Sequence, residues 1–416
     1  MVQQEIETKP RRRPPRPKPE PIGPFRFELG PFDELGEATA WHEGEPVSVP
    51  AGIPGEIVEA ELWPRQRGGF LGAVRHVERA DPARVAAPCR HFGECGGCRF
   101  QHVDYPVQLA IKRGRVRAEL AAVGLGDVAV EPALGMASPW GYRNHVRFSV
   151  RWGQLGYMRL TTHRFLPVEV CLIAHPRIVE VLRACQGQMP RLHQLLVRVG
   201  VRTGDLMVQP RLPEATAGAD GRPPLRLPFE TGQPYLTEIV AGHRFRISGP
   251  AFFQVNTEQA ERLVLWLRER LALTGREKLV DAYCGVGTLG ICLHARAREV
   301  VGIEESSAAL KDAAVNAAGL DHVRFVLGKT EAVLAREAPG ADVLVLDPPR
   351  CGCHPDVLTA ALAARPARLA YVSCDPRSLA RDLRVLVDGG YRLAAVQPID
   401  MFPQTPHVET AVLLEA

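Results

Sequence analysis

Two residues near the C-terminal end of the sequence, Cys374 and Glu409, could supply a nucleophile and a base. Cys374 follows the apolar run 369–372 and Glu409 precedes the apolar run 411–414, so each is expected at the end of a strand. A positioned cysteine is a strong nucleophile once its thiol has lost its proton, and a carboxylate can remove a proton from a substrate. Most free cysteines are only small buried apolar residues, so this interpretation depends on the neighbouring residues.

A nucleotide-binding pattern precedes these two residues. The stretch Gly-Val-Gly-Thr-Leu-Gly at 285–290 fits G-x-G-x-x-G after a strand, and Glu304 follows the first of these glycines by nineteen residues. The pattern fits a dinucleotide site or an S-adenosylmethionine (SAM) site, and in either one Glu304 would bind ribose hydroxyls. Two features favour SAM. Asp281 is placed to meet the amino-acid end of that ligand, and the motif Leu-Asp-Pro-Pro-Arg at 346–350 is not expected of a dehydrogenase.

One reaction requires all of these groups together: a thiol, a carboxylate, polar groups at a cleft and SAM. The C5 atom of uracil is a poor nucleophile. Attack of a thiolate at C6 creates an enolate, whose C5 can then take the methyl group of the sulfonium. A base removes the C5 proton and the thiolate leaves. The sequence therefore indicates uracil C5 methylation, with Asp347 and Arg350 aimed into the cleft by two stiff prolines.

Three cysteines, Cys89, Cys95 and Cys98, fall within ten residues. The N-terminus has no apolar segment typical of a secretory signal, and no apolar run approaches the length of a membrane span. We therefore expect a cytoplasmic protein, in which disulfides are rare, and these cysteines then favour a metal site. The residues alone permit either structural zinc or an iron–sulfur cluster.

The element pattern predicts an α/β protein with several domains. Residues 249–416 alternate strands and helices, which predicts a doubly wound, mainly parallel, Rossmann-like SAM domain whose ligands lie at the carboxyl ends of the strands. Residues 21–82 read as short strands between glycines and prolines, typical of a small OB-like β-barrel. Residues 83–248 are expected to be a mostly β middle domain that carries the cysteine segment, with helices at 103–125 and 175–185.

Residues 1–20 form a basic arm. Residues 9–19 hold six Lys or Arg and no acidic residue, although the whole chain has a formal charge of only +4. Such a run repels itself and is expected to be disordered. If the body handles nucleic acid, the arm, the barrel and the basic helix face at 112–117 would hold RNA phosphates. The target uridine must be unpaired or flipped out, since its C6 face is unreachable in a stack.

With these motifs the sequence resembles the RNA (uracil-5-)-methyltransferase family, and within it the bacterial 23S rRNA branch. The resemblance rests on residues 249–256, 281–288, 346–352, 373–376 and 407–409, and it extends to the N-terminal barrel, which resembles a TRAM domain. It implies Cys374 as nucleophile and Glu409 as proton acceptor. It implies SAM contacts for Gln254, Tyr283, Thr288, Glu304 and Asp347, with Gln254 and Asp347 also near the uracil; Thr288 stands where some relatives have asparagine.

The resemblance also implies a [4Fe–4S] cluster of structural role. Its ligands would be Cys89, Cys95, Cys98 and the distant Cys171. Cys185 is the spare candidate. Cys284 and Cys292 are interpreted as non-ligands, and Cys351 and Cys353 have no assigned role beyond packing. RNA, most of all 23S rRNA, is the expected partner of a monomeric protein without membrane contact.

Three other functions stay open. The same chemistry could act on the T-loop uridine of tRNA. An amino-group methyltransferase could use a proline-rich motif such as that at 346–350, but it would not need Cys374. A non-catalytic iron–sulfur RNA-binding protein is the third, and the presence of Cys374, Glu409 and Asp347 argues against it.

Overall fold

The computed structural model describes residues 20–65, 68–160, 162, 164–211 and 227–416. The predicted basic arm, except for its last residue, lies outside this part of the chain. The chain divides into two compact units, residues 1–82 and 83–416. In the described residues no helix is both long and apolar enough to cross a membrane.

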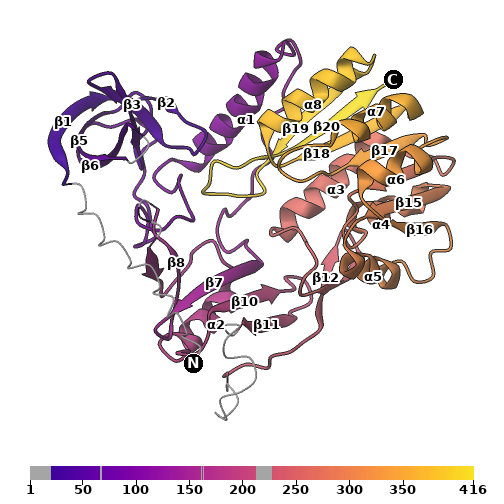
Figure 1. Cartoon of the computed structure of the whole chain (residues 1–416), viewed down its shortest axis with the longest axis horizontal. Coiled ribbons are helices and arrows are strands. Elements are labelled where there is room, and N and C mark those ends of the chain that lie inside the picture. Colours follow the sequence, from indigo (N-terminus) through magenta and orange to yellow (C-terminus); the bar gives the residue numbers. More distant parts are fainter. Residues whose placement is uncertain (1–19, 66–67, 161, 163, 212–226) are drawn as a thin grey trace, which may run out of the picture. The chain divides into compact units, whose positions relative to one another are not determined.

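The first unit contains one six-stranded sheet, drawn in indigo in Figure 1. Its order is β1-β5-β6-β4-β3-β2, and all neighbours are antiparallel except β4 and β6. Along β5 every second residue is buried, and these side chains join a core around Phe27, Val49 and Leu62. The strand-rich prediction is confirmed, and a closed TRAM barrel stays a prediction. The strands are β1 (Ile22–Glu28), β2 (Gly30–Phe32), β3 (Ala38–His42), β4 (Glu45–Val49), β5 (Ile57–Pro64) and β6 (Phe70–Arg79).

The second unit begins with the cysteine segment and a mostly β region. A five-stranded antiparallel sheet, β11-β10-β7-β8-β9, packs its apolar face against helix α2, whose Cys185 is buried in that core. The β12–β13 hairpin follows and packs against α5, so the boundary predicted after residue 248 falls inside this unit. The elements are α1 (Tyr105–Ala122), β7 (His145–Arg151), β8 (Gln154–Met158), β9 (Phe165–Pro167), α2 (Pro176–Cys185), β10 (Gln194–Val199), β11 (Leu206–Arg211), β12 (Tyr235–Val240) and β13 (His243–Ser248).

The rest of the second unit is a seven-stranded sheet in the order β16-β15-β14-β17-β18-β20-β19. Its first five strands are parallel, and β20 runs antiparallel to both neighbours. The elements are α3 (Thr257–Leu271), β14 (Lys278–Ala282), α4 (Thr288–Leu293), η2 (His294–Arg296), β15 (Glu299–Glu304), α5 (Ser307–Asn316), β16 (Val323–Leu327), α6 (Thr330–Glu337), β17 (Val343–Leu346), α7 (Pro355–Ala364), β18 (Arg368–Ser373), α8 (Pro376–Asp388), β19 (Arg392–Ile399) and β20 (Glu409–Glu415).

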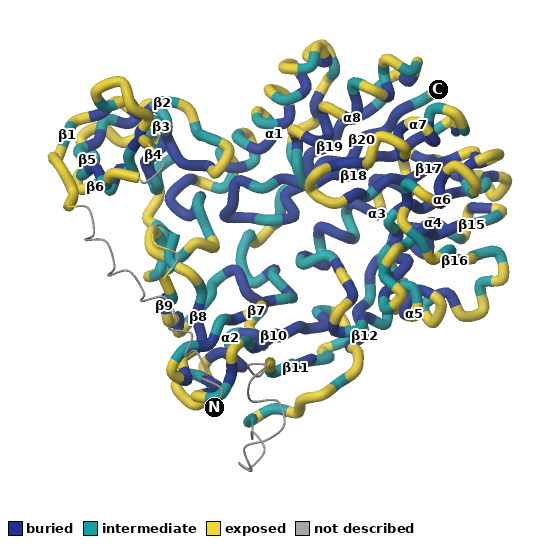
Figure 2. Tube along the Cα trace, viewed as in Figure 1, coloured by how far each residue is buried: buried dark blue, intermediate teal, exposed yellow. Residues whose placement is uncertain are grey.

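Helices cover both faces of this sheet, as the sequence predicts. Successive residues of β17 point alternately into two separate apolar cores, with Val343 and Val345 in one and Leu344 and Leu346 in the other. A strand buried on both faces needs a continuous apolar run, and this one has it. The inner strands β14, β17, β18 and β20 are therefore buried along nearly their whole length, whereas the edge strand β16 has no buried residue and the outer sides of the helices are exposed (Figure 2).

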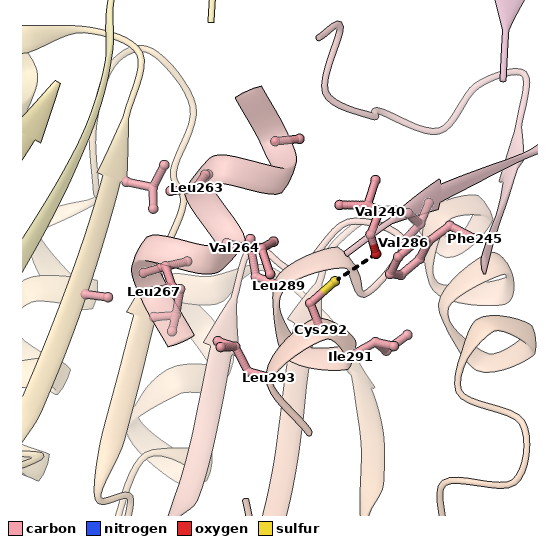
Figure 3. Close-up of a cluster of buried hydrophobic side chains, with 14 of the residues drawn as sticks. Val240, Phe245, Leu263, Val264, Leu267, Val286, Leu289, Ile291, Cys292 and Leu293 are labelled. Atoms are coloured by element: carbon pink, nitrogen blue, oxygen red, sulfur yellow. Dashed lines mark hydrogen bonds between the residues drawn. The ribbon is translucent and has the colours of Figure 1, made fainter. Parts of the chain in front are cut away.

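One of these cores lies between α3, α4 and the β12–β13 hairpin (Figure 3). Leu263, Val264 and Leu267 of α3 meet Leu289 and Leu293 of α4 there. The Cys292 thiol also points into this core, 3.7 Å from the carbonyl oxygen of Val240. Cys292 is thus a packed apolar residue.

The expected basic face of α1 is the one prediction here that is wrong. Lys112 is fully buried, forms an ion pair with Asp400 and donates to the carbonyl oxygen of Phe402 at 3.0 Å. Arg113 and Arg115 donate to backbone carbonyls of other segments. Helical periodicity shows which residues share a face, but it does not show what that face meets. Of the basic residues at 112–117, only Arg117 is exposed.

Candidate active site and cysteine cavity

A cavity of about 1170 Å³ opens at the carboxyl ends of β15, β17 and β18. It is lined by Gln254, Tyr283, Glu304, Asp347, Cys374 and Glu409. A smaller adjoining cavity shares Gln254, Tyr283 and Asp347 with it and adds Thr288 and Asp281. The structure therefore brings all seven residues proposed for catalysis and SAM contact to one place, although their roles stay predictions.

Strand register places the nucleophile candidate beside the base candidate. Strands β18 and β20 are antiparallel with Ser373 opposite Thr410, so Cys374 comes opposite Glu409 just beyond the last pair. Asp375 then caps α8, accepting a hydrogen bond from the Ser378 amide at 3.0 Å, and Ser373 and Asp375 bond each other. Cys374 is thus held between a strand end and a capped helix start.

Burial disfavours the charged forms of this pair. The Glu409 carboxyl is 3% exposed, and burial, followed by the nearby Asp347, raises its pKa well above the usual range. Burial likewise raises the pKa of Asp347 to about 7. Burial and the neighbouring Glu409 raise the pKa of Cys374 to about 11, although the positive charge of Arg350 acts to lower this pKa. A positively charged ligand in this cavity favours the ionised forms of all three.

Arg350 lines the cavity and contacts His407 behind it. The Arg350 guanidinium lies 3.1 Å from Nδ1 of His407, whose pKa burial and Arg350 lower to about 4. The neutral ring can therefore accept a hydrogen bond from Arg350. The sequence predicts that Arg350 points into the cleft, but it assigns no role to the His407 side chain. It also missed Phe402, which lines the cavity from a loop without any chemical motif.

The glycine loop lets the backbone come close to a ligand. Gly285 and Gly287 adopt the left-handed conformation, with φ of 57° and 83°, and a side chain at Gly287 would meet Ile291 at 2.8 Å. Glu304 accepts from the Gly285 amide at 3.0 Å and from the Ser306 amide at 2.7 Å, which fixes its carboxylate at the end of β15. This is the position from which an acidic residue reaches ribose hydroxyls.

Only one of the two carboxylate oxygens of Asp281 accepts a hydrogen bond from the described residues. Its Oδ2 accepts from the Gly290 amide at 2.7 Å, while its buried Oδ1 has no hydrogen-bond partner among the described residues. Burial raises the pKa of this carboxyl to about 7. A buried acceptor left without a partner is costly, so it suits a ligand that brings a donor, such as an ammonium group.

We expect this carboxyl to make SAM binding pH-dependent. If the ammonium group of SAM pairs with ionised Asp281, binding at a pH below the carboxyl's pKa of about 7 requires the carboxyl first to lose its proton. We expect the dissociation constant for SAM to fall about eightfold from pH 5.5 to pH 6.5, below the range in which the ligand's own amino group deprotonates. Titration calorimetry measures it. Asp281→Asn should bind weakly at both pH values, and a pH-independent wild type would contradict this role.

The second large cavity, of about 500 Å³, is lined by Cys89, Cys95, Cys98 and Cys171. The four thiols come from two segments about seventy residues apart in sequence, and Cys185 does not line the cavity. Burial raises the pKa of Cys95 to about 11 and of Cys98 to about 12. Without a cation these groups are therefore neutral thiols.

Among the residues that the structure describes, no group of three or more His, Cys, Asp or Glu side chains is placed to hold a metal ion. A tetrahedral zinc needs four ligands that converge on one point, whereas a [4Fe–4S] cluster takes four thiolates spread around a larger body. The four cysteines line one cavity, and their assignment as cluster ligands stays a prediction.

Comparison with known proteins identifies relatives over nearly the whole chain. A protein of Thermosynechococcus vestitus named as an uncharacterized RNA methyltransferase is 38% identical, over 94% of this chain and 97% of its own. One with the same description from Halalkalibacterium halodurans is 34% identical, over 91% and 94%. The profile of the tRNA (Uracil-5-)-methyltransferase family matches residues 337–416, which include Asp347, Cys374 and Glu409.

A solved structure shares the fold. The Pyrococcus abyssi tRNA (uracil-54, C5)-methyltransferase in complex with S-adenosyl-L-homocysteine superposes with a TM-score of 0.74 and covers 94% of this chain and 100% of its own. Its sequence identity is 24%, so this likeness concerns the arrangement of the elements.

Proposed function

The chain belongs to a family of RNA methyltransferases, and from that premise we propose that it methylates C5 of a uridine in 23S rRNA, with SAM as the methyl donor. The observation that carries the proposal is the register of β18 and β20, which sets Cys374 opposite Glu409 in the cavity that also holds the candidate SAM residues. An amino-group methyltransferase needs no thiol at this place.

Each residue then has a step in the reaction. The Cys374 thiolate, stabilised by Arg350, attacks C6 of the uracil. Gln254 and Asp347 hold the pyrimidine edge, and C5 takes the methyl group from the sulfonium. Glu409 removes the C5 proton, and elimination frees the Cys374 sulfur. The methyl group moves to carbon, the proton to the carboxylate and the electron pair back to sulfur.

The SAM molecule is held by the glycine loop and its neighbours. Glu304 accepts from the ribose hydroxyls and Asp281 from the ammonium, while Tyr283 and Thr288 contact the ligand from either end of the loop. A sulfonium bound in this cavity would be close to Asp347 and Glu409. That charge favours the ionised form of Glu409, which is the form that removes the C5 proton.

We infer 23S rRNA as substrate because the chain adds a separate β unit and a cysteine cavity to the methyltransferase fold, parts that the simplest tRNA enzymes of the resembled family lack. The T-loop uridine of tRNA is the second candidate, favoured by the family profile and by the superposed Pyrococcus abyssi enzyme. Incubating the protein with SAM and either 23S rRNA fragments or tRNA transcripts, then quantifying 5-methyluridine by mass spectrometry, separates them. Product on tRNA alone would reverse the choice.

We also propose that the four cysteines hold a [4Fe–4S] cluster with a structural role, joining the segment of Cys89, Cys95 and Cys98 to Cys171. Bound there, the cluster supplies a rigid link between these two segments. The cavity's size and its four thiols support this.

Metal analysis tests the cluster. Protein purified without oxygen is expected to contain about four iron and four sulfide per chain. Cys171→Ser should lower the iron content strongly, since it removes a ligand. The matched control is Cys185→Ala, in the neighbouring core, which should keep its iron. One zinc per chain and no iron would contradict the cluster.

A further inference from the structure

The loop between β19 and β20, residues 400–408, is buried although loops usually run over the surface. Seven of its nine residues are buried. We call it the base loop, because it leads directly into Glu409 and carries Phe402 to the wall of the active-site cavity. The base loop therefore adjoins the proposed base, which begins β20 and pairs with Ile399 of β19.

Groups from outside the base loop hold its backbone. Side chains donate to four of its carbonyl oxygens, and two backbone amides donate to a fifth. These bonds are Asn256 Nδ2 to Met401 at 3.3 Å, Lys112 Nζ to Phe402 at 3.0 Å, Tyr142 OH to Pro403 at 3.0 Å, the Arg99 and Phe100 amides to Gln404 at 2.9 and 3.1 Å, and Arg115 Nη1 to Pro406 at 3.3 Å. The conformation of this backbone therefore depends on the segments that donate these hydrogen bonds.

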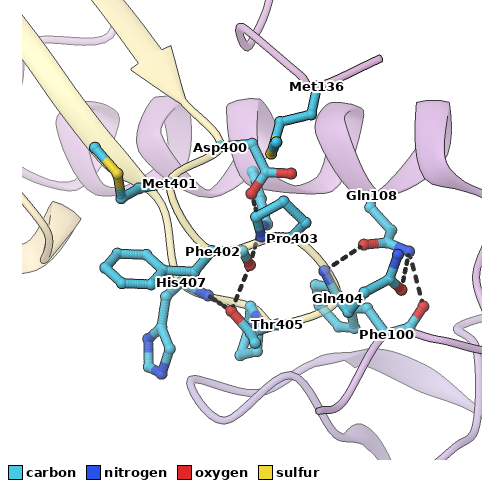
Figure 4. A network of polar contacts seen from close by, with 12 residues as sticks. Phe100, Gln108, Met136, Asp400, Met401, Phe402, Pro403, Gln404, Thr405 and His407 are labelled. Carbon is cyan, nitrogen blue, oxygen red and sulfur yellow. Dashed lines mark hydrogen bonds and ion pairs between the residues drawn. The ribbon is translucent and has the colours of Figure 1, made fainter. Parts of the chain in front are cut away.

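Helix α1 supplies two of the strongest attachments (Figure 4). At the start of the loop, Asp400 is fully buried, pairs with Lys112 and accepts from the Tyr105 hydroxyl at 2.8 Å. At its middle, Gln404 exchanges two hydrogen bonds with the buried side chain of Gln108, at 3.0 and 3.2 Å. Gln404 itself has a φ of 69°, which few side chains adopt without support.

The hydrogen bonds around Gln404 also involve the segment that lines the cysteine cavity. Arg99 and Phe100, whose amides hold the Gln404 carbonyl, directly follow Cys98 in sequence. Gln108 also donates to the carbonyl oxygens of Phe100 and Val103, both at 2.9 Å, so it ties this segment and the base loop together. Cys98 is thus joined to Gln404 through the two amides that directly follow it.

We propose that the base loop transmits the state of the cysteine cavity to the active site, with Gln108 and Lys112 as positioning residues for Glu409. The proposal rests on the function proposed above, since it names what places that reaction's base. Gln108 and Lys112 touch neither substrate nor SAM in this account, and they act only through the loop.

Hydrogen–deuterium exchange of the full-length protein tests the proposal without any catalysis. In Gln108→Met the amides of residues 400–408 should exchange at least about tenfold faster than in the wild type. The matched control is Gln186→Met, because Gln186 makes the same kind of two-way contacts with Leu155 and Val168 and none with the base loop. That control should leave exchange in the loop unchanged. Equal exchange in the wild type and Gln108→Met would overturn the proposal.

A separate experiment tests the link between the cysteine cavity and the base loop. Cys98→Ser, and as a second route wild-type protein stripped of metal by a chelator, should both accelerate exchange in residues 400–408 by a similar factor. If both leave the loop as protected as in the untreated protein, the cavity and the base loop are independent and the proposal is wrong.

Kinetics give a second readout that a merely structural role would not move. In Gln108→Met we expect kcat to fall about tenfold with an unchanged KM for SAM, and a covalent protein–RNA adduct to build up on unmodified RNA because proton removal is slowed. Loss of activity without adduct, or with the same loss in Gln186→Met, would contradict a positioning role. If the wild type transfers no methyl group to any RNA, the proposed function fails, while the exchange experiment still decides the coupling.

Discussion

Replacing Cys374 with alanine is expected to lower methyl transfer to RNA by at least about 10⁴-fold, while the dissociation constant for SAM stays within about threefold of the wild type. Without a thiolate at C6 the C5 atom of uracil does not become nucleophilic, so the chemical step is lost. The candidate SAM residues lie on other segments, before α3, at the ends of β14, β15 and β17 and at the start of α4, so this replacement leaves them in place. Radiolabelled methyl transfer and calorimetry measure the two quantities.

The control for this variant is Cys351→Ala. Cys351 is an exposed thiol that lines the same cavity, but nothing in the register of the sheet sets it opposite Glu409. Its replacement should leave the rate within about threefold of the wild type. Full activity of Cys374→Ala would instead point to an amino-group methyltransferase and exclude the thiolate mechanism.

Glu409→Gln is expected to stop the reaction after methyl transfer. Gln cannot take the C5 proton, so elimination should slow by about 10³-fold, within the range that general bases contribute. The thiol is not impaired, because removing the buried carboxyl removes one of the causes that raise the pKa of Cys374. The methylated adduct should therefore accumulate on unmodified RNA and appear as a slow band on a denaturing gel.

The stability of the same variant serves as its folding control. The pKa of Glu409 is raised in the folded state, so the stability that its protonated form contributes is present at low pH and declines as the pH rises through that pKa. Gln imitates the protonated form at every pH. Glu409→Gln should thus unfold at no lower temperature than the wild type at pH 8. A variant that is inactive, free of adduct and less stable would contradict the assignment of Glu409 as base.

Sequence patterns predicted the local parts of the site well. The glycine loop, the apolar run of β17 and the position of Cys374 at a strand end are properties of a few neighbouring residues, and periodicity and motif spacing detect them. The four cysteines were assigned from a resemblance, and the structure brings them around one cavity.

What the sequence could not predict are the long-range pairings. The position of Cys374 opposite Glu409 depends on β20 inserting antiparallel between β18 and β19, which no local pattern encodes. The sequence pattern predicts that Lys112 belongs to an exposed basic face. Its partner Asp400 lies 288 residues away in sequence, so no local pattern shows that Lys112 is buried. The buried base loop is not predicted for the same reason, since Lys112, Gln108, Tyr142, Asn256 and the Arg99 and Phe100 amides, which bond it, lie on segments distant in sequence.

A covalent trap tests the central claim, a thiolate mechanism at uracil C5, most directly. The protein is incubated with SAM and RNA that carries 5-fluorouridine, and the products are run on a denaturing gel. Fluorine at C5 cannot leave as a proton, so the account predicts a slow protein–RNA band that requires SAM and disappears in Cys374→Ala. Absence of such a band with both 23S rRNA fragments and tRNA, from protein that binds SAM, would contradict it.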